Sequence, residues 1–163
     1  MSEAMPKLVV IKNKTRYNQR MESQGHKKKI LVIDDDKFLL SMYSFKFKES
    51  GFEVTSVLGG AEALSKLREG ELFDIILLDL MMPVMNGFEL LDVLKKENLS
   101  PESKVIVFSN LGQPADIEKS RTLGANSYII KASTTPTEVV EKAYAVLDGA
   151  TSFDKIDQKN VQP

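Results

Sequence analysis

The stretch KILVIDDD, residues 29–36, places four aliphatic residues directly before three aspartates. A short aliphatic run that stops at polar residues is typical of a buried β-strand. Four further runs follow along the chain, and stretches with the 3.6-residue period of a helix separate them. The predicted strands are Ile30–Asp34, Glu53–Val57, Asp74–Asp79, Lys104–Phe108 and Ser127–Ile130, and the predicted helices cover about residues 36–50, 60–69, 87–97, 113–123 and 136–148.

The predicted helices carry suitable residues at their ends. Glycines, which accept the left-handed conformation that often follows a helix, stand at Gly51, Gly70, Gly124 and Gly149. The stretch TPTE, residues 135–138, has the pattern of a capping box with proline at the first helical position. The first, third and fourth strands are almost entirely aliphatic, as in parallel sheets covered on both faces. We therefore predict an α/β fold, a (βα)5 doubly wound, flavodoxin-like parallel five-stranded sheet with helices on both faces.

Charge divides the 163-residue chain into unlike segments. Residues 1–29 hold eight lysines and arginines against two acidic residues, whereas residues 30–163 hold fourteen against twenty-one. We expect a flexible basic arm at 1–29, a globular domain at 30–149 and a polar tail at 150–163, with no second domain. The arm is either a solubilising or expression tail or a partner-binding arm. Only Tyr17 interrupts its charges, which disfavours a nucleic-acid partner.

Composition excludes several classes of protein. The chain has no cysteine, so a disulfide framework, a thiolate nucleophile and a zinc ribbon are impossible, and we expect a cytoplasmic location. The uninterrupted aliphatic runs, such as residues 30–33 and 75–78, are far shorter than the ~18 residues of a membrane span. The apolar run at residues 8–11 is too short for a signal peptide.

Polar residues follow the predicted strands at the edge where an open parallel sheet binds ligands. They are Asp34, Asp35 and Asp36, then Asp79, then Ser109 with Asn110, and finally Lys131. Clustered carboxylates repel one another, by roughly 3 kcal/mol for a pair about 5 Å apart, so they call for a cation. Mg²⁺ prefers such oxygen ligands. Three carboxylates, one Mg²⁺ and one lysine sum to zero charge, which suits an anionic phosphoryl group.

Each of these residues also has an ordinary structural interpretation. The three consecutive aspartates could cap the first helix, and for Asp36 capping is the better interpretation. Asp79 could begin a turn, Lys131 could be a solvated surface residue, and Ser109 could be a loop former. Their joint placement at four strand ends favours a site.

These residues resemble the receiver domains of two-component response regulators, over about residues 28–149. The matching pieces are KILVIDDD (29–36), DLMMPVMNG (79–87), VIVFS (105–109) and GANSYIIK (124–131). The resemblance implies a stand-alone signalling domain of a phosphorelay, with Mg²⁺ as cofactor. It would be a phosphoacceptor, not an enzyme, although it would assist its own phosphotransfer and dephosphorylation.

The resemblance also implies a role for each site residue. Asp79 would accept the phosphoryl group from a sensor histidine kinase or phosphotransfer protein. Asp35 would bind Mg²⁺ directly and Asp34 mainly through water, with Asp79 and the Met81 backbone carbonyl as further ligands. Lys131 would pair with Asp79 and later with the phosphoryl oxygens.

A conformational switch is implied as well. Ser109 would move to hydrogen-bond the phosphoryl group and Tyr128 would repack; the alternative for Tyr128 is a ring that covers the sheet edge with its hydroxyl in water. Output would pass through the face formed by residues 113–123, 127–130 and 136–148, including Lys119, Arg121, Ser127 and Tyr128. That face would bind an unknown protein target or form a homodimer, unless its charged residues are only solvated surface.

The sequence departs from the family pattern in several places. Ala132 replaces the usual proline after the lysine, so the 131–132 bond is expected to be trans with some rearrangement, or cis with strain. Ser109 replaces a threonine, and Asn110 stands where a small residue is common. Met81 and Leu111 lie two residues beyond Asp79 and Ser109, where their apolar side chains are predicted to slow hydrolysis of the acyl phosphate.

Three alternative functions remain to be weighed. A phosphohydrolase resembling the haloacid-dehalogenase superfamily would use Asp34 as nucleophile and Asp36 as general acid/base, but it leaves the 79–87 motif unexplained and lacks its second acidic motif. A degenerate receiver would keep the fold and act only as a binding module. A flavin-binding relative lacks a Ser/Thr/Gly-rich phosphate loop after the first strand.

Overall fold

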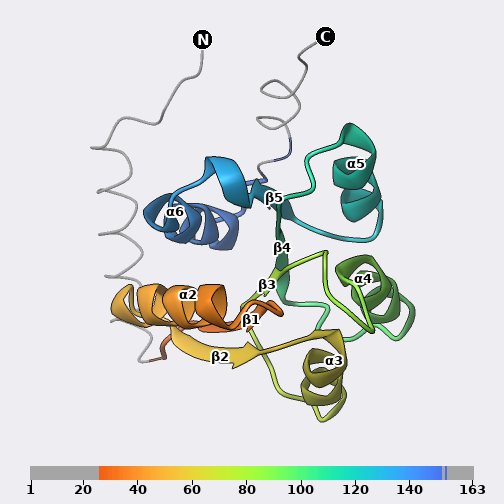
Figure 1. Ribbon diagram of the computed structural model, residues 1–163. Helices are drawn as coiled ribbons and strands as arrows, with labels where there is room; N and C mark the ends of the chain where they lie inside the picture. The colour runs from red at the N-terminus through yellow and green to blue at the C-terminus, as the bar shows by residue number, and fades with distance from the viewer. Residues whose placement is uncertain (1–25, 152, 154–163) are drawn as a thin grey trace, which may run out of the picture.

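A computed structural model describes residues 26–151 and residue 153. It contains one parallel five-stranded sheet with the order β2-β1-β3-β4-β5 (Figure 1). The strands are β1 (Lys29–Ile33), β2 (Glu53–Val57), β3 (Ile75–Leu78), β4 (Lys104–Ser109) and β5 (Ser127–Ile130). The helices are α2 (Lys37–Glu49), α3 (Gly60–Arg68), α4 (Gly87–Lys96), α5 (Pro114–Thr122) and α6 (Pro136–Leu147), and a 3-10 turn, η1, covers Lys131–Ser133.

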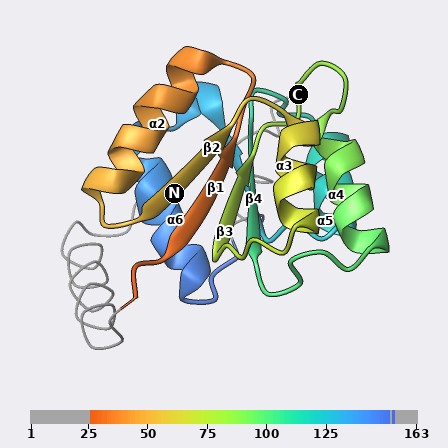
Figure 2. The ribbon, with the colours of Figure 1, turned by 90° about the horizontal axis from the view of Figure 1, so that it is seen from below.

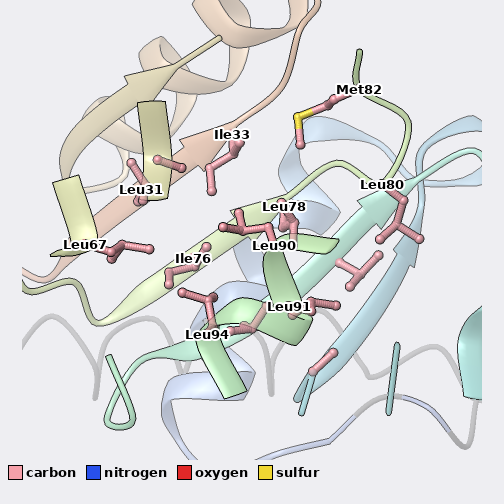
Figure 3. Packing of buried hydrophobic residues seen from close by; sticks show 14 of the residues in the cluster. Leu31, Ile33, Leu67, Ile76, Leu78, Leu80, Met82, Leu90, Leu91 and Leu94 are labelled. Atoms are coloured by element: carbon pink, nitrogen blue, oxygen red, sulfur yellow. The ribbon is translucent and has the colours of Figure 1, made fainter. Parts of the chain in front are cut away.

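The helices form two layers around the sheet. Helices α2 and α6 lie on one face, and α3, α4 and α5 lie on the other (Figure 2). Each face has its own hydrophobic cluster, and the strands contribute alternate side chains to the two clusters. On the α3–α5 face, leucines of α3 and α4 pack against the aliphatic side chains of β1 and β3 (Figure 3). The predicted doubly wound sheet is confirmed.

The local signals in the sequence account for the helix ends. Gly51, Gly70, Gly124 and Gly149 all have positive φ, so each occupies the conformation predicted for it. Thr135 forms the predicted capping box: its hydroxyl accepts from the Glu138 N–H, and the Glu138 carboxylate accepts from the Thr135 N–H.

Three strands differ from prediction by one residue at one or both ends, and β4 extends one residue further, to Ser109. Strand β1 ends at Ile33 and β3 at Leu78, so Asp34 and Asp79 are the first residues of the following loops. The backbone N–H groups of Asp34 and Asp79 still donate to Val57 and Ile33 of the neighbouring strands, but the regular pairing stops one residue earlier. The Lys131–Ala132 bond is trans, and η1 follows it directly.

Some predictions concern residues outside the described part of the chain. These are the basic arm, apart from residues 26–29, and the polar tail beyond residue 151, apart from residue 153. Among the described residues, no helix has the length and apolar character needed to cross a bilayer.

Candidate functional site

Three carboxylates meet at the carboxyl ends of β1 and β3. One oxygen from each of Asp34, Asp35 and Asp79 can be chosen so that all three lie within 4.8 Å of one another. Asp34 and Asp79 are buried, with 3% and 4% of their surface exposed, whereas Asp35 is exposed. Since β1 and β3 are hydrogen-bonded neighbours, parallel pairing alone brings the two loops together. The donor set is all oxygen and open to solvent at Asp35, so it fits Mg²⁺.

Lys131 directly follows β5, which β4 separates from β3 in the sheet, and its side chain reaches the three carboxylates. Its Nζ lies 2.7 Å from Asp34 Oδ2 and 3.4 Å from Asp79 Oδ1. The resemblance implied Asp79 as its partner, and the structure adds Asp34 as the nearer one. The lysine side chain is 12% exposed and its Nζ lies 5.3 Å from the centre of the Phe108 ring. A partly buried ammonium between two carboxylates reduces their mutual repulsion.

Asp79 binds a proton more readily than an ordinary aspartate does, because of its surroundings in the fold. Burial raises the pKa of Asp79 from 3.8 to about 6, although the nearby Lys131 ammonium opposes the shift. The charge of Asp34 raises this pKa further, and the Met81 N–H, which donates to Asp79 Oδ1 at 3.3 Å, lowers it. The fold thus destabilises the ionised form of Asp79, and a bound cation would stabilise that form.

Asp36 has a different function from its two neighbours. Its Oδ1 accepts from the N–H groups of Phe38 and Leu39 at 2.9 and 3.1 Å, so it caps α2 as predicted. Its own N–H donates to Asp34 Oδ1 at 2.9 Å and holds that carboxylate in place. A carboxylate occupied by the helix cap is not placed to act as the general acid/base of a hydrolase.

A close backbone approach fixes the loop that carries Asp79. We call residues 79–86 the acceptor loop. The Gly87 N–H donates to the Leu80 carbonyl at 3.0 Å, and a Cβ at Gly87 would lie 2.5 Å from the Asp79 carbonyl oxygen and 2.8 Å from Leu80 Cα. Only glycine fits there, which explains why the 79–87 motif ends in this residue. Asn86 then caps α4 by accepting from the Glu89 N–H.

Ser109 and Tyr128 meet at the backbone of Leu111. We call residues 110–113, between β4 and α5, the switch loop. The Leu111 N–H donates to Ser109 Oγ at 3.2 Å, and the Tyr128 hydroxyl donates to the Leu111 carbonyl at 2.5 Å. Burial raises the pKa of Tyr128 to about 12, so its hydroxyl remains a donor. The sequence did not identify this role of Leu111, because every residue has the same backbone groups.

The alternative for Tyr128 and one expectation about the interaction face are wrong. Tyr128 is fully buried with its hydroxyl bonded to protein, so its ring does not cover the sheet edge with the hydroxyl in water. Ser127 is fully buried as well, so neither residue is an accessible part of the predicted interaction face. Successive side chains of β5 point to opposite helix layers, and each layer covers the side chains that face it. Lys119 and Arg121 lie over aromatic rings, those of Phe88 and Phe153.

The remaining site residues line the edge of the site. Met81 is 62% exposed, Asn110 is exposed, and Leu111 is half-buried. Met81 follows Asp79 by two residues and Leu111 follows Ser109 by two, so both belong to the loops that border the buried carboxylates.

Comparison with known proteins identifies the family to which this chain belongs. The sequence profile of the response regulator receiver domain matches residues 30–144, most of the chain and all of the site. The chain belongs to the response regulator receiver domain family. Its members are phosphoacceptor domains of two-component systems rather than conventional enzymes, which removes the support for a hydrolase. Receiver domains bind Mg²⁺ at an acidic pocket and interact with histidine kinases or phosphotransfer proteins.

The relatives of this receiver domain differ in length. The chemotaxis protein CheY of Thermotoga maritima is 34% identical over 115 residues, which cover 70% of this chain and 92% of CheY. The phosphate regulon regulator PhoB of Rhizobium meliloti is 30% identical over 119 residues, but the chain spans only 52% of its length. A CheY-like receiver structure from Methanospirillum hungatei aligns with a TM-score of 0.70 at 31% identity, covering 80% of this chain and 98% of that one.

Proposed function

We propose that this protein is a response regulator that accepts a phosphoryl group on Asp79 from a histidine kinase or phosphotransfer protein, in a reaction that requires Mg²⁺. The observation that carries the proposal is the position of Asp79: it is buried, grouped with Asp34 and Asp35, and contacted by Lys131. The domain proper is residues 30–149. A cytoplasmic location accords with this role and with the lack of cysteine.

The chemistry is a transfer between two nucleophiles. An Asp79 carboxylate oxygen forms a bond to phosphorus while the bond between phosphorus and the donor imidazole nitrogen breaks. The imidazole nitrogen keeps the electron pair, and Asp79 becomes an acyl phosphate. Little else is required of the protein, because phosphoryl transfer depends mainly on positioning and charge neutralisation.

Each remaining site residue supports that step. Asp34 and Asp35, with Asp79 and the Met81 carbonyl, would hold Mg²⁺, which neutralises charge on the carboxylates and the phosphoryl oxygens when bound. Lys131 already contacts Asp79, and it would pair with the phosphoryl oxygens after transfer. Reversal to the free carboxylate needs only water attack on phosphorus, and we expect Met81 and Leu111 to slow it.

Phosphorylation would act on the rest of the domain through the switch loop. The Ser109 hydroxyl now accepts from the Leu111 N–H, and a phosphoryl group on Asp79 offers it a stronger charged acceptor. When Ser109 turns toward that group, the Leu111 N–H loses its partner and the neighbouring contact with Tyr128 is disturbed. A population shift of this kind requires only that the two states contact the phosphoryl group differently. The surface that responds would be the exposed part of α5 and α6, on either side of β5, which binds a protein target or a second copy.

The experiment is incubation with acetyl phosphate and Mg²⁺, followed by intact mass spectrometry. We expect one phosphoryl group on the wild type and none on Asp79→Asn. Asp36→Asn is the matched control, because asparagine retains the helix cap while losing the carboxylate. It should be phosphorylated like the wild type. Labelling that survives in Asp79→Asn, or that disappears in Asp36→Asn, would overturn the proposal.

A further inference from the structure

The chain beyond α6 crosses from one layer of the molecule to the other. Helix α6 ends at Leu147, Gly149 follows two residues later with a φ of +91°, and the Ala150 N–H donates back to the Ala145 carbonyl at 2.9 Å. Leu147 still packs with the α2–α6 cluster, whereas Phe153 belongs to the cluster under α3, α4 and α5. Leu147 and Phe153, six positions apart in the sequence, therefore pack on opposite faces of the sheet, whose edge strand on this side is β5.

Phe153 is held there by an aromatic contact and by burial. Only 5% of its surface is exposed, and the Arg121 guanidinium carbon lies 4.6 Å from the centre of its ring. Arg121 comes from the last turn of α5, and its Nη1 also lies 3.4 Å from the Glu118 carboxylate. A cation over an aromatic face and a largely buried ring are both favourable contacts. Phe153 is thus a bound side chain, although only a short segment connects it to α6.

We propose that Phe153 is an intramolecular ligand that covers the β5 edge of the α5–β5–α6 face in the unphosphorylated protein and is loosened by phosphorylation. The second half of this inference rests on the proposed function. A protein target that uses the same edge must displace Phe153, so it must offer its own aromatic or large aliphatic side chain to the place beneath Arg121.

The place where Phe153 packs, which we call its seat, is formed by elements that a rearrangement of the switch loop would disturb. Arg121 is on α5, the helix that directly follows the switch loop. Tyr128 lies in the same hydrophobic cluster as Phe153, and its hydroxyl is tied to Leu111 in that loop. A change at Ser109 that frees Leu111 therefore reaches both α5 and β5. Because a packed cluster rearranges as a unit, the seat of Phe153 weakens with it.

Hydrogen–deuterium exchange on the full-length protein tests both halves of the inference. Two peptides are followed: one from residues 121–130, at the seat of Phe153, and one from residues 79–87, at the acceptor loop. The probe for phosphorylation is beryllofluoride with Mg²⁺. Variants are Phe153→Ala and, as the matched control, Phe45→Ala, because Phe45 is 66% exposed on α2 in the opposite layer. Arg121→Gln removes the cation but keeps a helix-forming side chain of similar polarity.

Without the probe, we expect exchange in the 121–130 peptide to be about tenfold faster in Phe153→Ala than in the wild type, and intermediate in Arg121→Gln. Phe45→Ala should leave this peptide unchanged. Equal rates in the wild type, Phe153→Ala and Arg121→Gln would show that Phe153 is not a ligand of this face.

With the probe, exchange in the wild type should slow in the 79–87 peptide and accelerate in the 121–130 peptide. In Phe153→Ala, the second peptide should already exchange fast and change little. A response at 79–87 alone would overturn the coupling and leave the proposed function intact. No response in either peptide would overturn both the coupling and the proposed function, while the comparison without the probe still decides the docking of Phe153.

Discussion

The acceptor loop and the switch loop border the same site, but they are held in different ways. The acceptor loop is fixed by backbone contact, because α4 begins so close to Asp79 and Leu80 that a Cβ at Gly87 has no space. The switch loop is held by two hydrogen bonds at Leu111, one from the Tyr128 hydroxyl and one to Ser109 Oγ. The close backbone contact at Gly87 cannot be given up unless α4 moves. The groups that form the hydrogen bonds at Leu111 can instead bond to a new partner. Under the proposed function, we therefore expect the first loop to position the phosphoryl transfer and the second loop to respond to it.

The largest expected effect is that of Gly87→Ala. A Cβ 2.5 Å from a carbonyl oxygen forces the backbone of α4 away from the acceptor loop. We expect a loss of about 3 kcal/mol in the free energy of unfolding, measured by urea denaturation. Gly59→Ser is the control, because nothing lies within 4 Å of a Cβ there and serine can cap α3. Equal stability in Gly87→Ala and Gly59→Ser would mean that the acceptor loop is not sterically fixed.

A smaller effect follows from the pKa of Asp79, which the fold raises from 3.8 to about 6. The folded protein then binds more protons at this group than the unfolded chain does between about pH 4 and pH 6, so stability falls as pH rises through that window. In EDTA, Asp79→Asn should remove this fall and be more stable than the wild type at pH 7 by on the order of 2 kcal/mol. Urea denaturation of both proteins at pH 4 and pH 7 measures the difference. Parallel pH profiles would refute the buried, proton-favouring environment.

Tyr128→Phe tests the hydrogen bonds of the switch loop. It leaves the Leu111 carbonyl without its donor inside the protein, which should cost about 1 kcal/mol of stability. Tyr144→Phe is a matched control, since the Tyr144 hydroxyl donates to the Ser50 carbonyl in the other helix layer. Both variants should lose stability, but only Tyr128→Phe should change how hydrogen exchange in residues 110–113 responds to beryllofluoride. The same response in both variants would separate Tyr128 from the switch.

The smallest effect concerns the lifetime of the acyl phosphate. Met81 is exposed at the edge of the acceptor loop and Leu111 lies in the switch loop, so one apolar residue comes from each side. Met81→Asn or Leu111→Glu should speed hydrolysis about threefold, a change of about 0.6 kcal/mol in the barrier, because polar side chains admit water more readily. The decay of phosphorylated protein by intact mass gives the rate. An unchanged lifetime in both variants would show that these side chains do not limit water.

Local patterns in the sequence were sufficient to predict most of the fold. Aliphatic runs located five strands, glycines marked the ends of helices, and the capping box at Thr135 located the start of α6. The residues at the strand ends also gave the site, because parallel strands deliver their carboxyl ends to one edge. These predictions succeed because each depends on neighbours in the sequence or on the direction of the strands alone.

Contacts between distant segments could not be predicted in this way. No pattern in the sequence indicates that Lys131 lies nearer to Asp34 than to Asp79. Nor does any pattern indicate that the Tyr128 hydroxyl bonds to the backbone of Leu111. Phe153 lies in the stretch predicted to be a polar tail, yet it is buried in the cluster on the α3–α5 face. Such contacts depend on side-chain packing across layers, which leaves no periodic pattern along the chain.

The central claim is that Asp79 takes the phosphoryl group, and the most direct measurement locates that group on the chain. The protein is phosphorylated with acetyl phosphate and Mg²⁺, treated with borohydride to reduce the acyl phosphate to an alcohol, digested, and sequenced by tandem mass spectrometry. The account predicts that residue 79, and neither Asp34 nor Asp35, carries the reduced side chain. Reduction at Asp34 or Asp35, or phosphate that survives borohydride on a serine or histidine, would contradict it.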